Sequence, residues 1–176
     1  MRLIYLLTLF LTIPNFLFSQ NVVTEESLVE FKISNMGINS VKGTISGMTG
    51  EVFLDEKNIE NSRINICLEV ATIQTKNKGR DKHLKKEDFF DIENFPNICF
   101  TSKTIEKFNG KFIAKGILQI KNRKKEVEIP FTFNSESNEI IGNFSIKRTD
   151  FGVGPKGGFM VGKTVEITKV LCKLKS

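Results

Sequence analysis

The sequence predicts one all-β domain in which the strands run antiparallel. Five segments alternate apolar and polar residues with a period of two, which is typical of a sheet with one buried and one solvated face. Short polar or glycine-containing connections separate these segments, as hairpins require. No long apolar stripe has helical spacing, and only residues 75–94 look helical, for a short stretch.

The alternating segments account for most of the predicted sheet. In the first segment, Val29, Phe31 and Ile33 share one face. The same pattern predicts strands over residues 63–73, 111–120, 127–133 and 143–148. Three glycines interrupt residues 41–54, as expected where a strand bends or bulges at the corner of a barrel.

The connections carry turn chemistry. Asn109-Gly110 is the strongest short hairpin signal in the chain. The segments “KNRKKE” (121–126) and “NSESNE” (134–139) are polar and have the length of hairpin connections.

A sheet of about eight strands can bury one apolar face in two ways, as two stacked sheets or as one closed barrel. A barrel of about eight strands leaves an interior that is either packed or wide enough for a slim ligand. Several phenylalanines fall on the apolar faces and could fill a core or line a tunnel: Phe31, Phe100, Phe112, Phe131, Phe133 and Phe144. Periodicity does not decide between these two outcomes.

The first 19 residues differ from the rest of the chain. Arg2 precedes an apolar run broken by Pro14, and the small or polar residues Ser19 and Gln20 follow. This order is typical of a secretory signal peptide, with a membrane anchor as the alternative because the apolar run approaches bilayer-spanning length. We expect residues 1–19 to be cleaved and residues 20–176 to form a single domain of a periplasmic or secreted protein.

The formal net charge is +6, or +5 once Arg2 is removed. An exported protein rarely meets nucleic acid, and the basic run over residues 76–86 lacks the interleaved aromatic residues that stack on bases. The excess charge either solubilises the surface, which we favour, or faces anionic lipid or envelope polymers.

Candidates for catalysis and metal binding are few. No serine lies in a G-x-S-x-G sequence, and the cysteines lie in strand-like segments, where free cysteine is usually inert. A metal site that joins His83, the only histidine, to nearby carboxylates has suitable ligand types but no recognised spacing. We therefore predict no enzyme activity, no catalytic residue, no metal and no cofactor, and we interpret His83 as structural.

Three cysteines, Cys67, Cys99 and Cys172, cannot all pair within one chain. An oxidising compartment would permit one disulfide. We prefer Cys67–Cys99, because their segments are expected to be neighbours.

Three stretches of the sequence resemble a known family when taken together. They are “FKISNMGINSVKGTISGMTGEV” (31–52), “RDKHLKKEDFFDIENFPNICFTS” (80–102) and “IKRTDFGVG” (146–154). In this order and spacing they resemble the YceI-like family of exported polyisoprenoid-binding proteins, over about Val29 to Leu174. The middle stretch is the most specific, with its Arg-Asp-x-His-Leu start, its Phe-Phe-Asp centre and a Phe-Pro before a strand.

The resemblance implies an extended, eight-stranded, antiparallel lipocalin-like barrel with one short helical segment around residues 80–90. In this family the barrel encloses an apolar tunnel that holds an isoprenoid chain, such as a quinone tail or a polyprenyl lipid, without catalytic residues. The resemblance places Arg80, Asp81 and His83 in the helical segment. It places Asp150 and Gly152 in a turn that closes the later strands, where glycine permits a backbone shape that other residues resist.

The residues expected on the tunnel wall are those on the apolar faces of the strands together with those that the resemblance implies at the pocket. They are Phe31, Ile33, Met36, Ile66, Leu68, Phe89, Phe90, Phe95, Phe100, Phe112, Leu118, Ile129, Phe131, Phe133, Phe144, Ile146 and Phe151. The chain departs from the family in the turn after Ile120, in its glycine-rich segment 152–162 and in its cysteines. These departures concern headgroup and rim contacts rather than the barrel.

We therefore expect an exported protein that binds an isoprenoid lipid or similar amphiphile for storage, transport or envelope stress response. Moving one five-carbon isoprene unit from water into an apolar tunnel gains about 3–4 kcal/mol. Such lipids start in a bilayer that is already apolar, so shape and headgroup contacts decide binding. Transient contact with a membrane surface and a homodimer are further expectations. The alternative is a ligand-free barrel that acts as an interaction module of the envelope.

Overall fold

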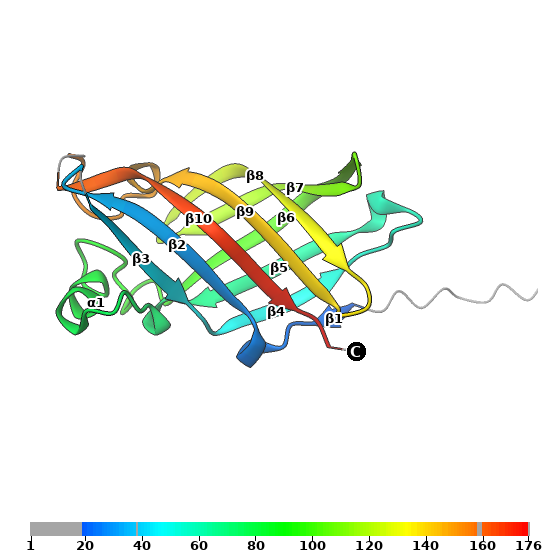
Figure 1. Cartoon of the computed structure of the whole chain (residues 1–176), viewed down its shortest axis with the longest axis horizontal. Helices are drawn as coiled ribbons and strands as arrows, with labels where there is room; N and C mark the ends of the chain where they lie inside the picture. The colour runs from blue at the N-terminus through cyan, green and yellow to red at the C-terminus, as the bar shows by residue number, and fades with distance from the viewer. Residues whose placement is uncertain (1–18, 38, 158–159, 176) are drawn as a thin grey trace, which may run out of the picture.

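Ten antiparallel strands form one curled sheet in the computed structural model, which describes residues 19–37, 39–157 and 160–175 (Figure 1). Along the sheet the strands follow the order β1-β4-β5-β6-β7-β8-β9-β10-β2-β3. Their bounds are β1 Gln20–Asn21, β2 Leu28–Asn35, β3 Asn39–Ile45, β4 Met48–Phe53, β5 Arg63–Glu69, β6 Asn97–Phe108, β7 Lys111–Ile120, β8 Arg123–Asn134, β9 Glu139–Lys147 and β10 Val161–Lys173. Except for Ser19, the predicted signal peptide lies outside the described residues.

The remaining elements are short. One α-helix, α1, spans Lys78–Leu84, and four 3-10 turns are η1 Thr24–Glu26, η2 Ile59–Asn61, η3 Val70–Thr72 and η4 Arg148–Phe151. In the described parts of the chain, no helix has the length and apolar character needed to cross a bilayer.

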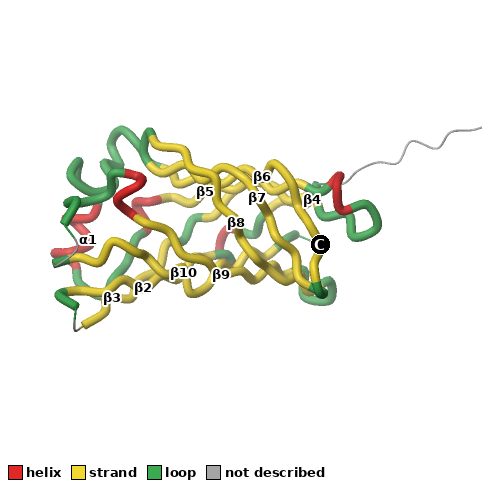
Figure 2. The backbone as a smooth tube through the Cα atoms, turned by 90° about the horizontal axis from the view of Figure 1, so that it is seen from above, coloured by secondary structure: helices red, strands yellow, loops and turns green. Residues whose placement is uncertain are grey.

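The sheet wraps round, and each of its two edge strands is held by a short stretch of backbone pairing (Figure 2). At one end of the barrel β1 bridges β4 to the end of β10, since the Lys175 N–H donates to the Asn21 carbonyl at 2.9 Å. At the other end, Thr44 of β3 exchanges backbone hydrogen bonds of 2.9 and 3.0 Å with Gln74. The predicted lipocalin-like barrel is thus confirmed.

The strand number differs slightly from the predicted eight. Residues 41–54 form two strands, β3 and β4, rather than one bent strand. They separate at Gly47, whose φ of +68° is a left-handed conformation that ends a strand and that glycine adopts without strain. The two-residue strand β1 has no alternation that the sequence could reveal.

The predicted alternation and hairpins are present, but the connection predicted over residues 121–126 is shorter, because β8 begins at Arg123 and only residues 121–122 form the turn. Asn109 and Gly110 have φ of +49° and +76°, as a type I′ turn between β6 and β7 requires. In β7, every second residue is buried from Phe112 to Ile120. The interior of the barrel therefore receives one face of each strand.

The helix is shorter than the predicted segment around residues 80–90. It begins after Asn77, whose side-chain oxygen caps the Arg80 N–H at 2.9 Å, and it ends at Leu84. After Leu84 the chain reverses through tight turns, and Asp91 adopts a φ of +54°. With no apolar stripe to bury along a longer helix, this segment instead turns so that its phenylalanines face the barrel.

Cys67 of β5 and Cys99 of β6 lie directly opposite each other and form a disulfide, with 4.1 Å between their Cα atoms. This is the pairing that the sequence analysis preferred. Cys172 is free and buried, and burial raises the pKa of its thiol to about 12, so the thiol stays protonated at neutral pH.

Removing the Cys67–Cys99 disulfide should destabilise the protein. The bridge joins residues 32 positions apart, and closing a loop of this size lowers the entropy of the unfolded chain, worth about 2–4 kcal/mol. We expect the Cys67→Ala/Cys99→Ala variant to lose that free energy of unfolding in urea denaturation. Dithiothreitol should weaken the wild-type protein similarly and leave the variant unchanged. An equal effect of reductant on both would contradict the expectation.

Candidate functional site: an apolar cavity beside α1

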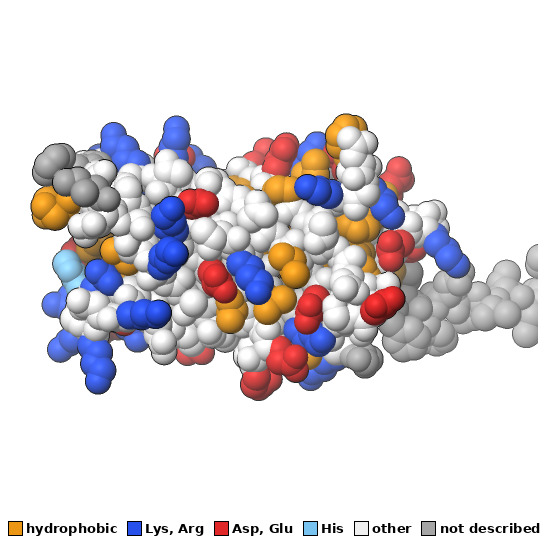
Figure 3. Space-filling view, viewed as in Figure 1, with side chains coloured by type: hydrophobic (Ala, Val, Ile, Leu, Met, Phe, Trp, Pro, Cys, Tyr) orange, Lys and Arg blue, Asp and Glu red, His pale blue; other side chains and the backbone are white. Residues whose placement is uncertain are grey.

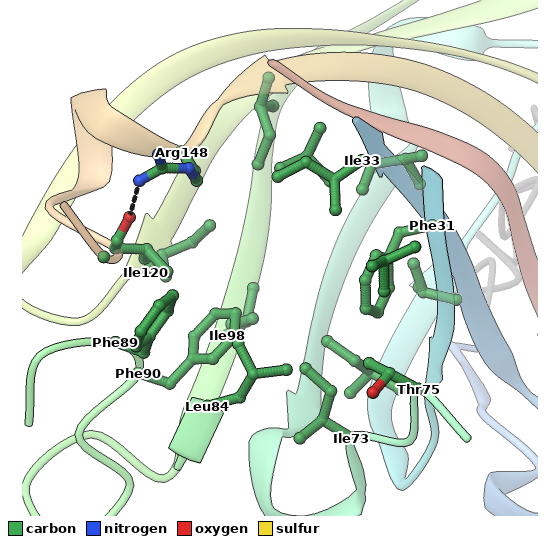
Figure 4. Close-up of a pocket in the computed structure, with 18 of the residues that line it drawn as sticks. Phe31, Ile33, Ile73, Thr75, Leu84, Phe89, Phe90, Ile98, Ile120 and Arg148 are labelled. Atoms are coloured by element: carbon green, nitrogen blue, oxygen red, sulfur yellow. Dashed lines mark hydrogen bonds between the residues drawn. The ribbon is translucent and has the colours of Figure 1, made fainter. Parts of the chain in front are cut away.

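A cavity of about 740 Å³ lies inside the barrel toward the end that carries α1 (Figure 4). Its volume falls within the range of small-molecule sites, about 300–1,000 Å³. Its wall is made by inward-facing side chains of the strands, and segments 73–90 and 148–155 complete it. Most lining residues are apolar, and the polar ones are Ser34, Asn35, Thr75, Arg80, His83, Asp88 and Arg148.

Most residues expected on the tunnel wall line this cavity. They are Phe31, Ile33, Ile66, Leu68, Phe89, Phe90, Phe100, Leu118, Ile129, Phe144 and Ile146. The strand residues among them converge because alternate side chains of a strand point to the same face of the sheet. Figure 4 shows Leu84, Phe89 and Phe90 reaching the cavity from the α1 segment, opposite Phe31 and Ile33.

The other six expected residues do not line this cavity. Phe112 and Phe131 are buried in the other half of the barrel, where their rings stack with centroids 5.2 Å apart. Phe133 and Phe151 pack against or within the core. Phe95 is half-buried outside the cavity, and Met36 is 48% exposed in the turn after β2. Alternation assigns a side chain to a face, but it does not give its depth along the barrel.

A layer of four residues closes the cavity toward the other half of the barrel. Ile66, Phe100, Ile129 and Val170 line both the main cavity and a second one of about 30 Å³. The second cavity has room for about one water molecule. Space for an apolar chain therefore ends at this layer.

Thr75 connects the α1 segment to the wall of the cavity. Its backbone N–H donates to a carboxylate oxygen of Asp81 at 2.9 Å, and its hydroxyl donates to the same oxygen. The Arg80 guanidinium donates to the Thr75 hydroxyl at 2.8 Å and to its carbonyl at 2.9 Å. Arg80 and Asp81 thus hold the first turn of α1 against a buried threonine.

His83 and Asp88 lie at the exposed rim of the cavity. The His83 Nε2 is 2.8 Å from an Asp88 carboxylate oxygen, and its ring meets the edge of Phe89 with centroids 5.0 Å apart. In the part of the chain that the structure describes, no three His, Cys, Asp or Glu side chains are grouped to hold a metal ion. The contacts of His83 with Asp88 and Phe89 orient the turn that carries Phe89.

Arg148 is a site residue that the sequence analysis missed. It is 3% exposed, and its five N–H groups donate at 2.7–3.0 Å to the carbonyls of Val153, Pro155, Gly157, Val161 and Gly162. Burial lowers the pKa of its guanidinium, which starts so high that the group stays charged. Arg148 therefore organises the loop after η4, which supplies Val153, Gly154 and Pro155 to the cavity.

A signal for Arg148 was present in the sequence. Phe144, Ile146 and Arg148 are each two positions apart, so the alternation of β9 assigns them to the same, inward face. A charged residue therefore follows two apolar residues on that face. A glycine-rich segment comes directly after it and offers many accessible carbonyls. The turn residues Asp150 and Gly152 lie within or after η4, where Gly152 has a φ of +70°.

Comparisons with known proteins place the chain in a family and a fold. The YceI-like domain matches residues 21–171. The UPF0312 protein of Vibrio campbellii is 28% identical over 138 residues, 73% of each chain. Burkholderia cenocepacia BcnA superposes with a TM-score of 0.79 at 21% identity, over 88% of this chain and 99% of its own. A polyisoprenoid binding domain from Saccharophagus degradans, implicated in plant cell wall breakdown, gives 0.67 at 11% identity, over 89% and 98%.

Replacing Arg148 by lysine should destabilise the protein although the charge is kept. A lysine has three donors and cannot serve five carbonyls, and each buried carbonyl left unpaired costs about 1–3 kcal/mol. We expect Arg148→Lys to lower the free energy of unfolding by about 2–4 kcal/mol in urea denaturation. The control Arg123→Lys changes an exposed arginine and should stay within about 0.5 kcal/mol of wild type. Similar losses in both variants would refute this role.

Proposed function

The chain belongs to the YceI-like family, and from this premise we propose that its cavity binds the hydrocarbon chain of a polyisoprenoid, such as a quinone tail or a polyprenyl lipid. The observation that carries the proposal is the apolar cavity of about 740 Å³ inside the barrel. The resemblance to a solved polyisoprenoid binding domain supports it. A ligand-free interaction module instead favours a solid core, which this barrel has only in the half that holds Phe112 and Phe131.

The chemistry of the wall restricts what the cavity accepts. A polar group placed among these side chains without a hydrogen-bond partner would cost several kcal/mol, of the order of 2–7. The polar side chains near the rim, including Ser34, His83 and Asp88, are the groups able to meet a headgroup. We therefore place the hydrocarbon inside the barrel and the headgroup at the α1 end.

The proposed setting is the cell envelope, and the proposed role is storage, transport or stress response rather than catalysis. Cleavage after Ser19 would leave Gln20 as the first residue, so that β1 stays intact. The Cys67–Cys99 disulfide suits an oxidising compartment. A homodimer remains a prediction, to be tested by the mass of the protein in solution.

The cavity volume sets a limit on the length of chain that is fully enclosed. A methylene occupies about the volume of a water molecule, about 30 Å³, so 740 Å³ holds about 25 such groups, or about five isoprene units. We expect affinity for a series of prenyl alcohols to rise up to about five units and then to level off. Native mass spectrometry of delipidated protein with each alcohol measures this. A continued rise in affinity at much longer lengths would contradict the limit.

The decisive test of the proposal blocks the cavity from within. Val165 of β10 lines the cavity, whereas its neighbour Thr164 is exposed on the outer face. We expect Val165→Trp to abolish a prenyl adduct, because the indole occupies the space of the chain, while Thr164→Trp keeps it. Protein made in an exporting host is examined by native mass spectrometry, followed by organic extraction of the adduct. Wild-type protein that stays free of adduct, even after quinones and polyprenyl phosphates are added, would overturn the proposal.

A further inference from the structure

Two exposed methionines stand side by side at the end of the barrel that holds the cavity. The Met36 N–H donates to the Met160 carbonyl at 3.2 Å, and the side chains are 48% and 57% exposed. Their chain neighbours Asn35 and Val161 pair across β2 and β10 and line the cavity. We call Met36 and Met160 the methionine tip. It places exposed apolar surface next to the lining of the cavity.

Basic residues gather at the same end. Apart from the buried Arg148, segments 76–93, 121–126, 147–157 and 160–163 together carry thirteen Lys and Arg against seven Asp and Glu. At the opposite end, the connections 54–62, 106–111 and 134–139 carry three against six. Figure 3 shows lysine and arginine crowded at the α1 end and acidic side chains toward the other. A surface that only needs solubility would intersperse the two signs, so the segregation calls for another cause.

We propose that the α1 end of the barrel docks on an anionic lipid bilayer. In this arrangement the methionine tip enters the interface between headgroups and hydrocarbon, and the surrounding lysines meet lipid phosphates. Apolar side chains set in a basic surface are the pattern by which proteins bind such interfaces. Each lysine held close to an anionic surface strengthens binding about fivefold at moderate salt.

Docking in this orientation solves a physical problem of cargo transfer. The proposal rests on the proposed function, since it identifies the surface from which the cavity would be loaded. A hydrocarbon that left the bilayer through water would expose each of its isoprene units to solvent, which is strongly unfavourable. A cavity rim held against the bilayer keeps the chain out of water throughout. The methionine tip and the lysines beside it thus act when the hydrocarbon chain is loaded from the bilayer, whereas the wall residues hold the chain inside the cavity.

The test measures binding of delipidated protein to vesicles that contain no prenyl lipid. Sedimentation is compared for vesicles of phosphatidylcholine alone and of phosphatidylcholine mixed with an equal amount of phosphatidylglycerol. We expect binding only to the mixed vesicles, and loss of that binding at high salt because salt screens exposed charges. Met36→Ser/Met160→Ser should weaken binding about tenfold, and Lys156→Glu/Lys163→Glu about 25-fold or more.

Matched controls come from the opposite end of the barrel. Phe108 is 67% exposed in the β6–β7 hairpin, and Lys57 and Lys111 are exposed nearby. Phe108→Ser also replaces an exposed apolar side chain by serine, and Lys57→Glu/Lys111→Glu reverses two exposed charges; both should leave vesicle binding unaltered. Equal losses in control and tip variants, or equal binding to neutral vesicles, would overturn the docking proposal.

The outcome is separable from that of the proposed function. If native mass spectrometry finds no prenyl adduct but the tip variants still lose vesicle binding, docking stands and the cargo proposal fails. If adducts form and vesicles never bind, docking fails and the cargo proposal stands. Tip variants purified from the exporting host and retaining a prenyl adduct would show that their cavities remain intact.

Discussion

The interior of the barrel receives side chains from only one face of the sheet. The rest of the structure depends on where those side chains fill the interior and where they leave it open. In one half, buried side chains fill the space, and the rings of Phe112 and Phe131, which are paired on the neighbouring strands β7 and β8, stack on each other. In the other half a ring can lie against the wall. Phe31 lies over Gly43 of β3, where an added Cβ would stand 2.5 Å from the ring, so this glycine gives the ring room along the sheet. One alternating pattern thus produces both a core and a cavity.

A second constraint concerns the polar groups that surround an apolar space. The loop after η4 and the first residues of β10 turn five carbonyls toward Arg148, which supplies one donor for each of them. A guanidinium suits this role because it offers five donors in a fixed plane and no acceptor that would need a partner. The dipoles of these carbonyls stabilise its positive charge. The loop can therefore border the cavity without exposing unpaired backbone groups to it.

The sequence predicted the faces of the strands well, and it predicted the shape of the interior poorly. The alternation along each strand correctly assigned Phe100, Leu118 and Ile129 to the inward face, where they line the cavity. This was possible because alternation is a local property of the backbone. Depth along the axis depends on strand tilt and register, so Phe112 could not be separated from Phe100 by pattern alone. Arg148 was overlooked because a charge after apolar residues is normally interpreted as the end of a strand. The basic run over residues 76–86 was visible in the sequence, but the gathering of basic residues at the α1 end of the barrel was not, because segments far apart in the sequence form it.

Two segments border the cavity at the α1 end, the α1 segment and the loop after η4. Each is fixed at its base, and the interactions between them are limited. The α1 segment is held by the Cys67–Cys99 disulfide at its base and by Arg80 and Asp81 on Thr75. The loop after η4 is held by Arg148. Between them, the Gly154 N–H donates to the Asp88 carbonyl at 2.9 Å, and Phe89 packs on Gly154. Separating these two segments breaks few interactions, whereas parting two strands breaks a whole ladder. Parting the two segments would leave the sheet intact, and it would open the barrel at the end where the basic residues and the methionine tip lie.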